Sequence, residues 1–272
     1  MKIKSLFIFL MVAAFCLMTN LASAGNLVVK GSTTVLPIAQ KMAEEYMKQT
    51  PSVKISISGG GSGNGIKALI DGSTDIANSS RFIKDKEIKL AVDRDIYPVP
   101  FSVAYDCIIP VVHSTNTLTN ITLDQLKDIY MGNIRNWKEL GGPDRPVVVV
   151  SRDTSSGTYE VWSKKVMKKE RVFPGALLQA SNGAVAQTVA KNKNAVGYIG
   201  IGYLNEDVKP LSVNGIKGSI ESTLNGTYPV SRPLYMFTPG WPKGETLNFI
   251  NFVLHPEKGQ KYIGDAGYVP LY

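Results

Sequence analysis

Apolar strand patterns alternate with helical patterns along most of the chain. The first five elements are a strand, a helix, a strand, a helix and a strand, at residues 26–32, 35–50, 53–58, 65–72 and 75–80. In the first of these helices, Ile38, Met42 and Tyr46 recur at spacings of four and therefore share one face. This alternation is typical of an α/β fold with a largely parallel sheet.

Residues 96–113 form a longer β-rich run that breaks the alternation. Pro98, Pro100 and Pro110 interrupt it, and proline is disfavoured in a central strand because it cannot donate a ladder hydrogen bond. We therefore interpret this run as the place where the chain leaves one lobe and enters another.

A second lobe is predicted from the elements that follow. Its helices and strands are expected at residues 122–132, 146–151, 156–170, 183–191 and 195–204. The remaining elements are expected to return to the first lobe, with crossings near residues 103–108 and 199–205. These crossings define a first lobe of residues 25–105 and 203–272 and a second lobe of residues 106–202.

The first 24 residues have the pattern of a cleaved export signal. Lys2 and Lys4 precede an apolar stretch, and the small residues at 22–24 predict cleavage between Ala24 and Gly25. No later segment supplies the roughly 20 continuous apolar residues of a membrane-spanning helix. We therefore expect an exported, soluble protein of the periplasm.

Cysteine usage and charge add two further expectations. Cys16 lies in the export signal after a bulky phenylalanine, which is a poor match to a lipid-modified cysteine. Removal of the signal leaves Cys107 alone, so no intrachain disulfide is expected. The formal net charge of +8 loses two lysines with the signal, and the remaining excess mildly favours an anionic ligand.

Several loops share one composition, in which an apolar strand runs into hydroxyl or glycine residues and then into a helix. The candidate binding residues in these loops are Ser32, Thr33, Thr34, Ser62, Gly63, Ser80, Arg81, Arg152, Ser155, Ser156, Gly157 and Thr158. The first amides of a helix are unpaired and attract anions, hydroxyls can donate without adding charge, and glycine permits close approach.

Such loops gather at the carboxyl ends of the strands in an open α/β sheet, where ligands usually bind. Each loop alone is more simply explained as a helix cap or a turn. The alternative for each arginine is a surface ion pair, and for Arg81 alone the two explanations are equally good. Together, the loops predict a cage of donors that fits a tetrahedral oxyanion. Arg81 and Arg152 could each make two-pronged contacts with its oxygens.

At these same residues the sequence resembles the phosphate-binding proteins of bacterial phosphate ABC transporters. The motifs are "GSTTV", "SGGGSGNGI", "DIANSSR", "ITLDQLKDIYMGNIRNWKELGG", "SRDTSSGTYEVW", "AVGYIG" and "GYVPL", and they span essentially the whole mature chain. The resemblance implies a periplasmic-binding-protein fold: two lobes, each a mixed β-sheet flanked by helices, joined by a two-strand hinge. It also implies that inorganic phosphate is the ligand and that the permease of an ABC transporter is the partner.

The sequence departs from the best-studied branch of the family at Ser80. That branch has an aspartate there, which accepts the proton of bound phosphate. A carboxylate also repels fully ionised sulfate, whereas a hydroxyl does not. Discrimination against sulfate or arsenate is therefore open, with Asp106 and Asp153 as possible substitutes for the missing acceptor.

Other classes of function fit the sequence less well. An exported hydrolase would need a base beside a loop serine, and His113 and His255 lie in no motif. The basic run at 163–171 has the spacing of a solvated helix face rather than a nucleic-acid module. No metal motif or cofactor motif is present, and a surface adhesin remains compatible with the composition. We expect a monomeric receptor without enzymatic activity.

Overall fold

The computed structural model describes residues 25–272, so the predicted export signal and Cys16 lie outside the described residues. A nine-stranded mixed sheet has the order β2-β1-β3-β11-β4-β8-β6-β7, with β9 paired to β4. Its strands are β1 (Asn26–Gly31), β2 (Lys54–Ser58), β3 (Ile76–Ser79), β4 (Val99–His113), β6 (Val148–Arg152), β7 (Leu177–Gln179), β8 (Ala195–Gly200), β9 (Val208–Pro210) and β11 (Ser231–Thr238). A small second sheet pairs β5 (Asn120–Ile121) with β10 (Ser212–Val213).

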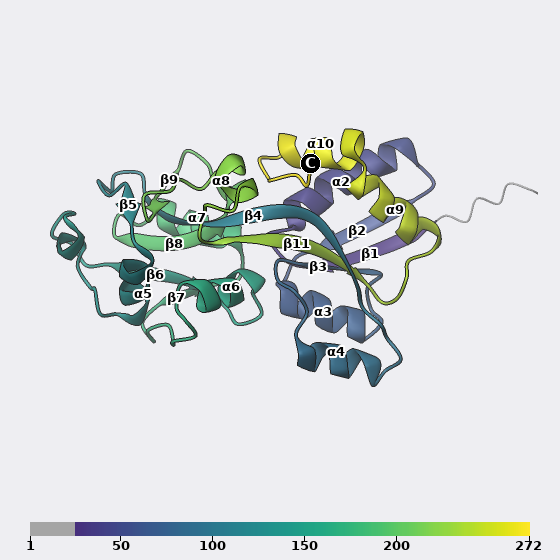
Figure 1. Cartoon of the computed structure of the whole chain (residues 1–272), viewed down its shortest axis with the longest axis horizontal. Helices are drawn as coiled ribbons and strands as arrows, with labels where there is room; N and C mark the ends of the chain where they lie inside the picture. The colour runs from purple at the N-terminus through teal and green to yellow at the C-terminus, as the bar shows by residue number, and fades with distance from the viewer. Residues whose placement is uncertain (1–24) are drawn as a thin grey trace, which may run out of the picture.

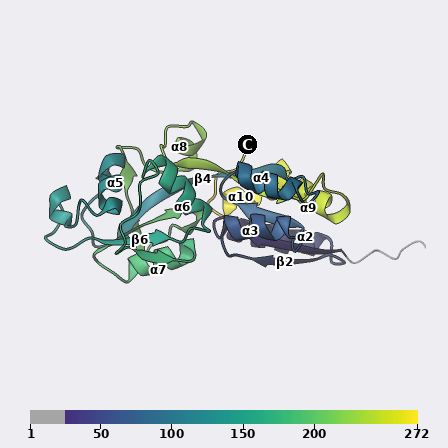
Figure 2. The same ribbon diagram turned by 90° about the horizontal axis from the view of Figure 1, so that it is seen from below.

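Helices cover the two ends of this sheet separately (Figures 1 and 2). One end carries α2 (Leu36–Gln49), α3 (Ser62–Ile70), α4 (Asp85–Val92), α9 (Gly244–Leu254) and α10 (Lys261–Asp265). The other end carries α5 (Leu123–Met131), α6 (Gly157–Lys165), α7 (Asn182–Ala190) and α8 (Ile220–Leu224). Short helical turns lie at η1 (Trp137–Leu140), η2 (Ile201–Tyr203) and η3 (Pro256–Gln260).

The buried side chains form separate cores at the two ends, which defines two lobes. In the first lobe Ile38 and Met42 of α2 lie in the same core as Phe249 of α9, so the shared face that the helical spacing predicts is the buried one. A smaller cluster under α3 and α4 completes that lobe. The second lobe is built around Trp162 and Tyr198, whose rings stack with centroids 4.3 Å apart.

Two long antiparallel strands, β4 and β11, connect the lobes (Figure 1). On β4, Val103 and Ala104 pack in the first core, whereas Cys107 packs in the second. On the return strand, Leu234 packs in the first core. The α/β fold with a two-strand connection is therefore confirmed.

The second crossing lies later in the chain than the sequence pattern predicts. Val208, Leu211, Tyr228 and Val230 all pack in the second core, so the predicted return near residue 203 is corrected to β11. The reason is non-local pairing: β9 joins β4 and β10 joins β5, which holds the intervening segment on the second lobe. Below, the first lobe is residues 25–104 and 234–272, and the second is residues 107–230.

Within residues 25–272, no helix combines the length and apolar character needed to cross a membrane.

Candidate functional site

Four strand ends meet where the two lobes touch. The hydroxyl groups of Thr34, Ser62, Ser80 and Thr158 follow β1, β2, β3 and β6, and all four residues are buried. The hydroxyl oxygens of Thr34 and Thr158, from opposite lobes, are 3.0 Å apart. Those of Ser62 and Ser80 are 3.2 Å apart. Four of the predicted binding residues therefore lie in one cluster.

Helix α3 positions Ser62 at its first residue. Gly61 precedes the helix with a φ of 98°, a conformation that glycine adopts readily. One turn later, a Cβ on Gly65 would lie 2.6 Å from the Cα of Gly31, so the absence of a side chain lets α3 pack closely on β1. The Ser62 hydroxyl accepts a hydrogen bond of 3.0 Å from the amide of Ser80.

Helix α6 positions Gly157 and Thr158 in its first turn. Ser156 is the N-cap, and its hydroxyl accepts a 3.2 Å hydrogen bond from the amide of Tyr159. Gly157 and Thr158 lie between Ser156 and Tyr159. Their backbone amides are not used by the hydrogen bonds of the helix and lie at its positive end. A Cβ on Gly157 would lie 2.4 Å from the Ser62 hydroxyl oxygen, so the two lobes meet closely here.

The first loop contributes mainly through Thr34. The Ser32 hydroxyl accepts from the amide of Thr34 at 3.1 Å, so it stabilises the loop. Thr33 contacts the second lobe: its hydroxyl accepts from Asn182 at 3.2 Å, and its carbonyl accepts from the hydroxyl of Tyr203. Sequence reasoning did not identify Asn182, whose side-chain amide also donates to the Thr34 hydroxyl at 3.0 Å.

Gly63 and Ser155 contact each other across the lobes. The amide of Gly63 donates to the carbonyl oxygen of Ser155 at 2.9 Å, and the Ser155 hydroxyl lies 3.2 Å from the Gly60 carbonyl oxygen. Asp153, a suggested proton acceptor, accepts hydrogen bonds from the amide and the hydroxyl of Ser155. Gly63 and Ser155 therefore join the lobes, and Asp153 holds Ser155 in place within the second lobe.

Arg81 forms ion pairs with two carboxylates. Its two terminal nitrogens donate to the carboxylate of Glu87 at 2.8 and 2.7 Å, and its Nε lies 2.9 Å from the carboxylate of Glu160. The fourth contact goes to the Phe82 carbonyl oxygen. Arg81 thus forms ion pairs, but buried ones rather than the surface pair considered from the sequence, and Glu160 makes one of them a contact between the lobes.

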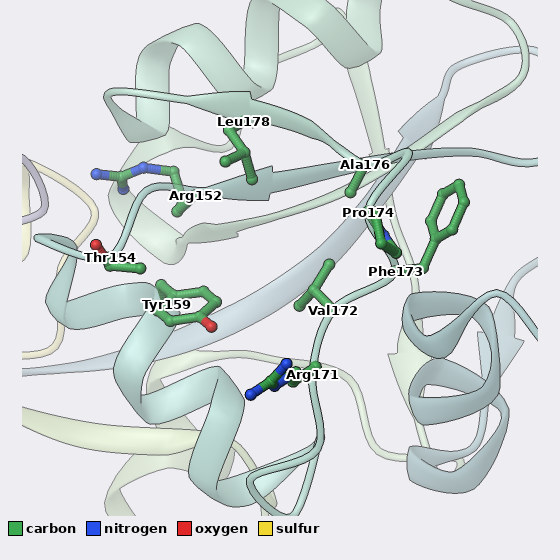
Figure 3. A pocket seen from close by; sticks show the side chains of 9 residues that line it. All are labelled: Arg152, Thr154, Tyr159, Arg171, Val172, Phe173, Pro174, Ala176 and Leu178. Carbon is green, nitrogen blue, oxygen red and sulfur yellow. The ribbon is translucent and has the colours of Figure 1, made fainter.

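Arg152 is buried and incompletely paired. It donates from Nε to the Gln179 carbonyl oxygen at 2.9 Å and from one terminal nitrogen to that of Ala180 at 3.0 Å. The other terminal nitrogen has no hydrogen-bond partner within the described residues. Burial lowers the pKa of Arg152. It borders a cavity of about 370 Å³, but Figure 3 shows its guanidinium turned away from Arg171 and Phe173, which line the cavity's other side.

A second buried arginine, Arg232, was not identified from the sequence. It lies on β11 and forms an ion pair with Asp106 on β4, at distances of 2.7 and 2.9 Å. Burial raises the pKa of Asp106, and the adjacent guanidinium opposes this effect. The sequence signal that could have found this pair is one charged residue inside each of two apolar strands, Asp106 in one and Arg232 in the other.

Within residues 25–272, neither histidine lies in contact with the clustered serines. His113 contacts Thr115 and His255 contacts the amide of Glu257, and neither histidine makes a hydrogen bond to the cluster. Among residues 25–272, no group of three or more histidine, cysteine, aspartate or glutamate side chains could hold a metal ion.

Comparison with known proteins identifies the family. The family model of the PBP superfamily domain matches residues 19–257. The phosphate-binding protein PstS of Bacillus subtilis is 30% identical, over 92% of this chain and 82% of the relative. The protein of the same name from Staphylococcus epidermidis is 33% identical, over 88% of this chain and 77% of the relative.

Solved structures give the same result. A phosphate ABC transporter substrate-binding protein from Clostridium perfringens with bound phosphate matches with a TM-score of 0.86 and 34% identity, covering 91% of this chain and 100% of the other. An ABC-type phosphate transport receptor from Vibrio cholerae matches with a TM-score of 0.73 and 33% identity, covering 89% of this chain and 99% of the other.

Proposed function

Since the chain belongs to the PBP superfamily and, within it, to the PstS phosphate-binding proteins, we propose that it binds inorganic phosphate between its lobes. The bound phosphate is delivered to the permease subunits of an ABC transporter. The protein acts as a monomeric receptor in the periplasm after cleavage of its export signal. It requires no metal or cofactor.

One observation supports this proposal most strongly: uncharged donors from both lobes converge at one place. The hydroxyls of Thr34, Ser62, Ser80 and Thr158 lie within one cluster, next to the positive end of α6. Hydroxyls and free helix amides can replace the hydration shell of a tetrahedral anion. Arg152, at the end of β6, is a further buried cation, and one of its terminal nitrogens has no hydrogen-bond partner within the described residues.

The other predicted residues have supporting roles in this proposal. Ser32 and Ser156 stabilise the loops that present the donors, and Gly157 allows the lobes to approach. Thr33, Gly63 and Ser155 join the lobes. Arg81 stabilises closure through Glu160 and does not bind the anion.

Closure follows from the position of the donors. Because they come from both lobes, an anion can contact all of them only in the closed form, so its binding shifts the population toward that form. The strands β4 and β11 act as the hinge. No chemical reaction is required, and we expect no phosphatase activity, since within residues 25–272 the Ser62 hydroxyl bonds only to Ser80 and to no base.

Calorimetry on residues 25–272 tests the assigned ligand. We expect phosphate to bind at one site per chain, and sulfate to bind more weakly. Sulfate binding as tight as phosphate, or no phosphate binding, would contradict the assignment. Incubation with an aryl phosphate tests the enzymatic alternative. Turnover that Ser62→Ala abolishes would establish that the protein is an enzyme.

A further inference from the structure

Arg232 and Asp106 face each other on the two strands that connect the lobes. They are direct partners in the antiparallel register of β11 and β4, although 126 residues separate them in sequence. Arg232 is 5% exposed and Asp106 is fully buried. This ion pair therefore lies at the base of the interlobe site, where a hinge motion would displace it least.

The guanidinium of Arg232 contacts both sides of the site. One terminal nitrogen lies 3.2 Å from the Thr34 hydroxyl of the first lobe and 3.0 Å from the Thr158 hydroxyl of the second. The other donates to the carbonyl oxygen of Ser80 at 3.1 Å. Arg232 thus contacts three of the four residues whose hydroxyls form the cluster.

The oxygens of Asp106 are already paired with protein groups. One oxygen accepts hydrogen bonds from both Nε and a terminal nitrogen of Arg232. The other accepts a hydrogen bond of 2.9 Å from the amide of Ile201. Asp106 therefore does not replace the aspartate that position 80 lacks. Among the described residues, none of the four clustered hydroxyls makes a hydrogen bond to a carboxylate.

We propose that Arg232, held in position by Asp106, is an anion-binding residue at the base of the phosphate site, and that the site consequently tolerates fully ionised oxyanions such as sulfate. This inference rests on the proposed function. Asp106 offsets part of the charge of Arg232, but the terminal nitrogens still direct N–H groups at the cluster, where they can donate to any tetrahedral oxyanion. A carboxylate against the ligand would add repulsion of fully ionised sulfate, and among the described residues none is bonded to the clustered hydroxyls.

Calorimetry of Arg232→Gln with phosphate and with sulfate tests the inference. Loss of a charged hydrogen-bond donor should weaken the binding of both anions by about 10- to 100-fold. Arg94→Gln is the matched control, because Arg94 pairs with Asp71 on the surface and should leave both affinities unchanged. For the unaltered protein, we expect sulfate to bind measurably, though more weakly than phosphate.

A second variant separates binding from folding. Arg232→Gln leaves Asp106 buried without its partner, which destabilises the fold. The double variant Asp106→Asn with Arg232→Gln removes both charges and should fold while binding neither anion well. Thermal unfolding without ligand identifies folded variants.

The outcomes distinguish the inference from the proposed function. If the unaltered protein fails to bind phosphate, the proposed function is wrong. If it binds phosphate and the folded double variant binds equally well, the role of Arg232 is wrong while the function stands. If phosphate binds and sulfate does not bind at all, the tolerance of other oxyanions is refuted.

Discussion

Gly157 occupies the point where a side chain would keep the hydroxyl groups of the two lobes apart. A Cβ there would lie 2.4 Å from the Ser62 hydroxyl oxygen and 2.6 Å from that of Ser80. Both serines are buried and belong to the first lobe, whereas Gly157 begins α6 of the second. The closed arrangement therefore depends on the absence of a side chain at this position.

Gly157→Ala should weaken phosphate binding while leaving each lobe folded. Overpacking of a close contact costs about 1–3 kcal/mol, which corresponds to a roughly 5- to 150-fold increase in Kd. Gly264→Ala is the matched control because its added Cβ would meet no atom within 4 Å apart from its chain neighbours and the backbone of its own helix. Calorimetry measures both, and equal affinities for the two variants would show that the contact does not limit closure.

Cys107 illustrates how burial suppresses chemistry. It is fully buried, and burial raises the pKa of its thiol to about 12. The thiol thus stays protonated at about pH 8, and the thiolate is the reactive form. We expect the folded protein, residues 25–272, to resist an aromatic disulfide reagent and the protein in guanidinium to react fully. Rapid labelling without denaturant would contradict this.

Residues of the site differ in how far the sequence predicts them. Ser62, Ser80 and Thr158 were predicted because a strand end, a small residue and a helix start are adjacent in the chain. Arg232 was not, because its role depends on pairing with Asp106 across the register of two distant strands. Arg81 was predicted to bind the anion. Its pairing with Glu160 could not be predicted from the sequence, because that contact depends on how the lobes meet.

At the level of secondary structure, α6 carries both a set of donors and an electrostatic contact between the lobes. Thr158 lies in its first turn, and Glu160 follows two residues later. The carboxylate of Glu160 lies 2.9 Å from Arg81 and 2.6 Å from Lys84, both in the first lobe. It also lies 3.3 Å from Lys164 of its own helix. Closure thus forms ion pairs between Glu160 and two cations of the first lobe, and opening would break both pairs.

A double-mutant cycle tests this contact. Glu160→Gln should weaken phosphate binding by about 3- to 10-fold, because partly buried pairs exceed the 0.2–1 kcal/mol of exposed ones. Lys84→Met should couple with it, whereas Lys164→Met should not, since that pair persists in the open form. The cycle is measured by calorimetry at low and high salt. Equal coupling for both lysines would show that Glu160 acts only within α6.

Up to β8 the sequence pattern predicted most elements from local periodicity, but it did not predict α4, β5 and β7. Beyond β8 it was less successful. Residues 203–230 instead consist of short strands, turns and the five-residue helix α8, and pairing of the strands with β4 and β5 rather than their own composition decides their lobe. Hydrophobic pattern cannot assign such segments, and this is why the second crossing was placed too early.

At the level of the whole molecule, the two connecting strands define how the lobes can move. β4 and β11 are paired along most of their length, with a register irregularity between Leu234 and Tyr235 beside the crossing. The lobes have separate cores, so each can move as a unit while the strands absorb the rotation. The interlobe contacts of the closed form then open together.

Distance measurements between spin labels should detect this motion. Cysteines replacing exposed Lys67 of the first lobe and Lys138 of the second report on the gap between lobes, and the buried Cys107 stays unlabelled. Phosphate should shorten and narrow this distance distribution, because the anion stabilises the closed form. Labels at Lys67 and Lys48, both in the first lobe, serve as the control and should not respond. An unchanged interlobe distribution in protein that binds phosphate would mean that the lobes are already closed before binding, so that the donors form a rigid site and the hinge has no role in recognition.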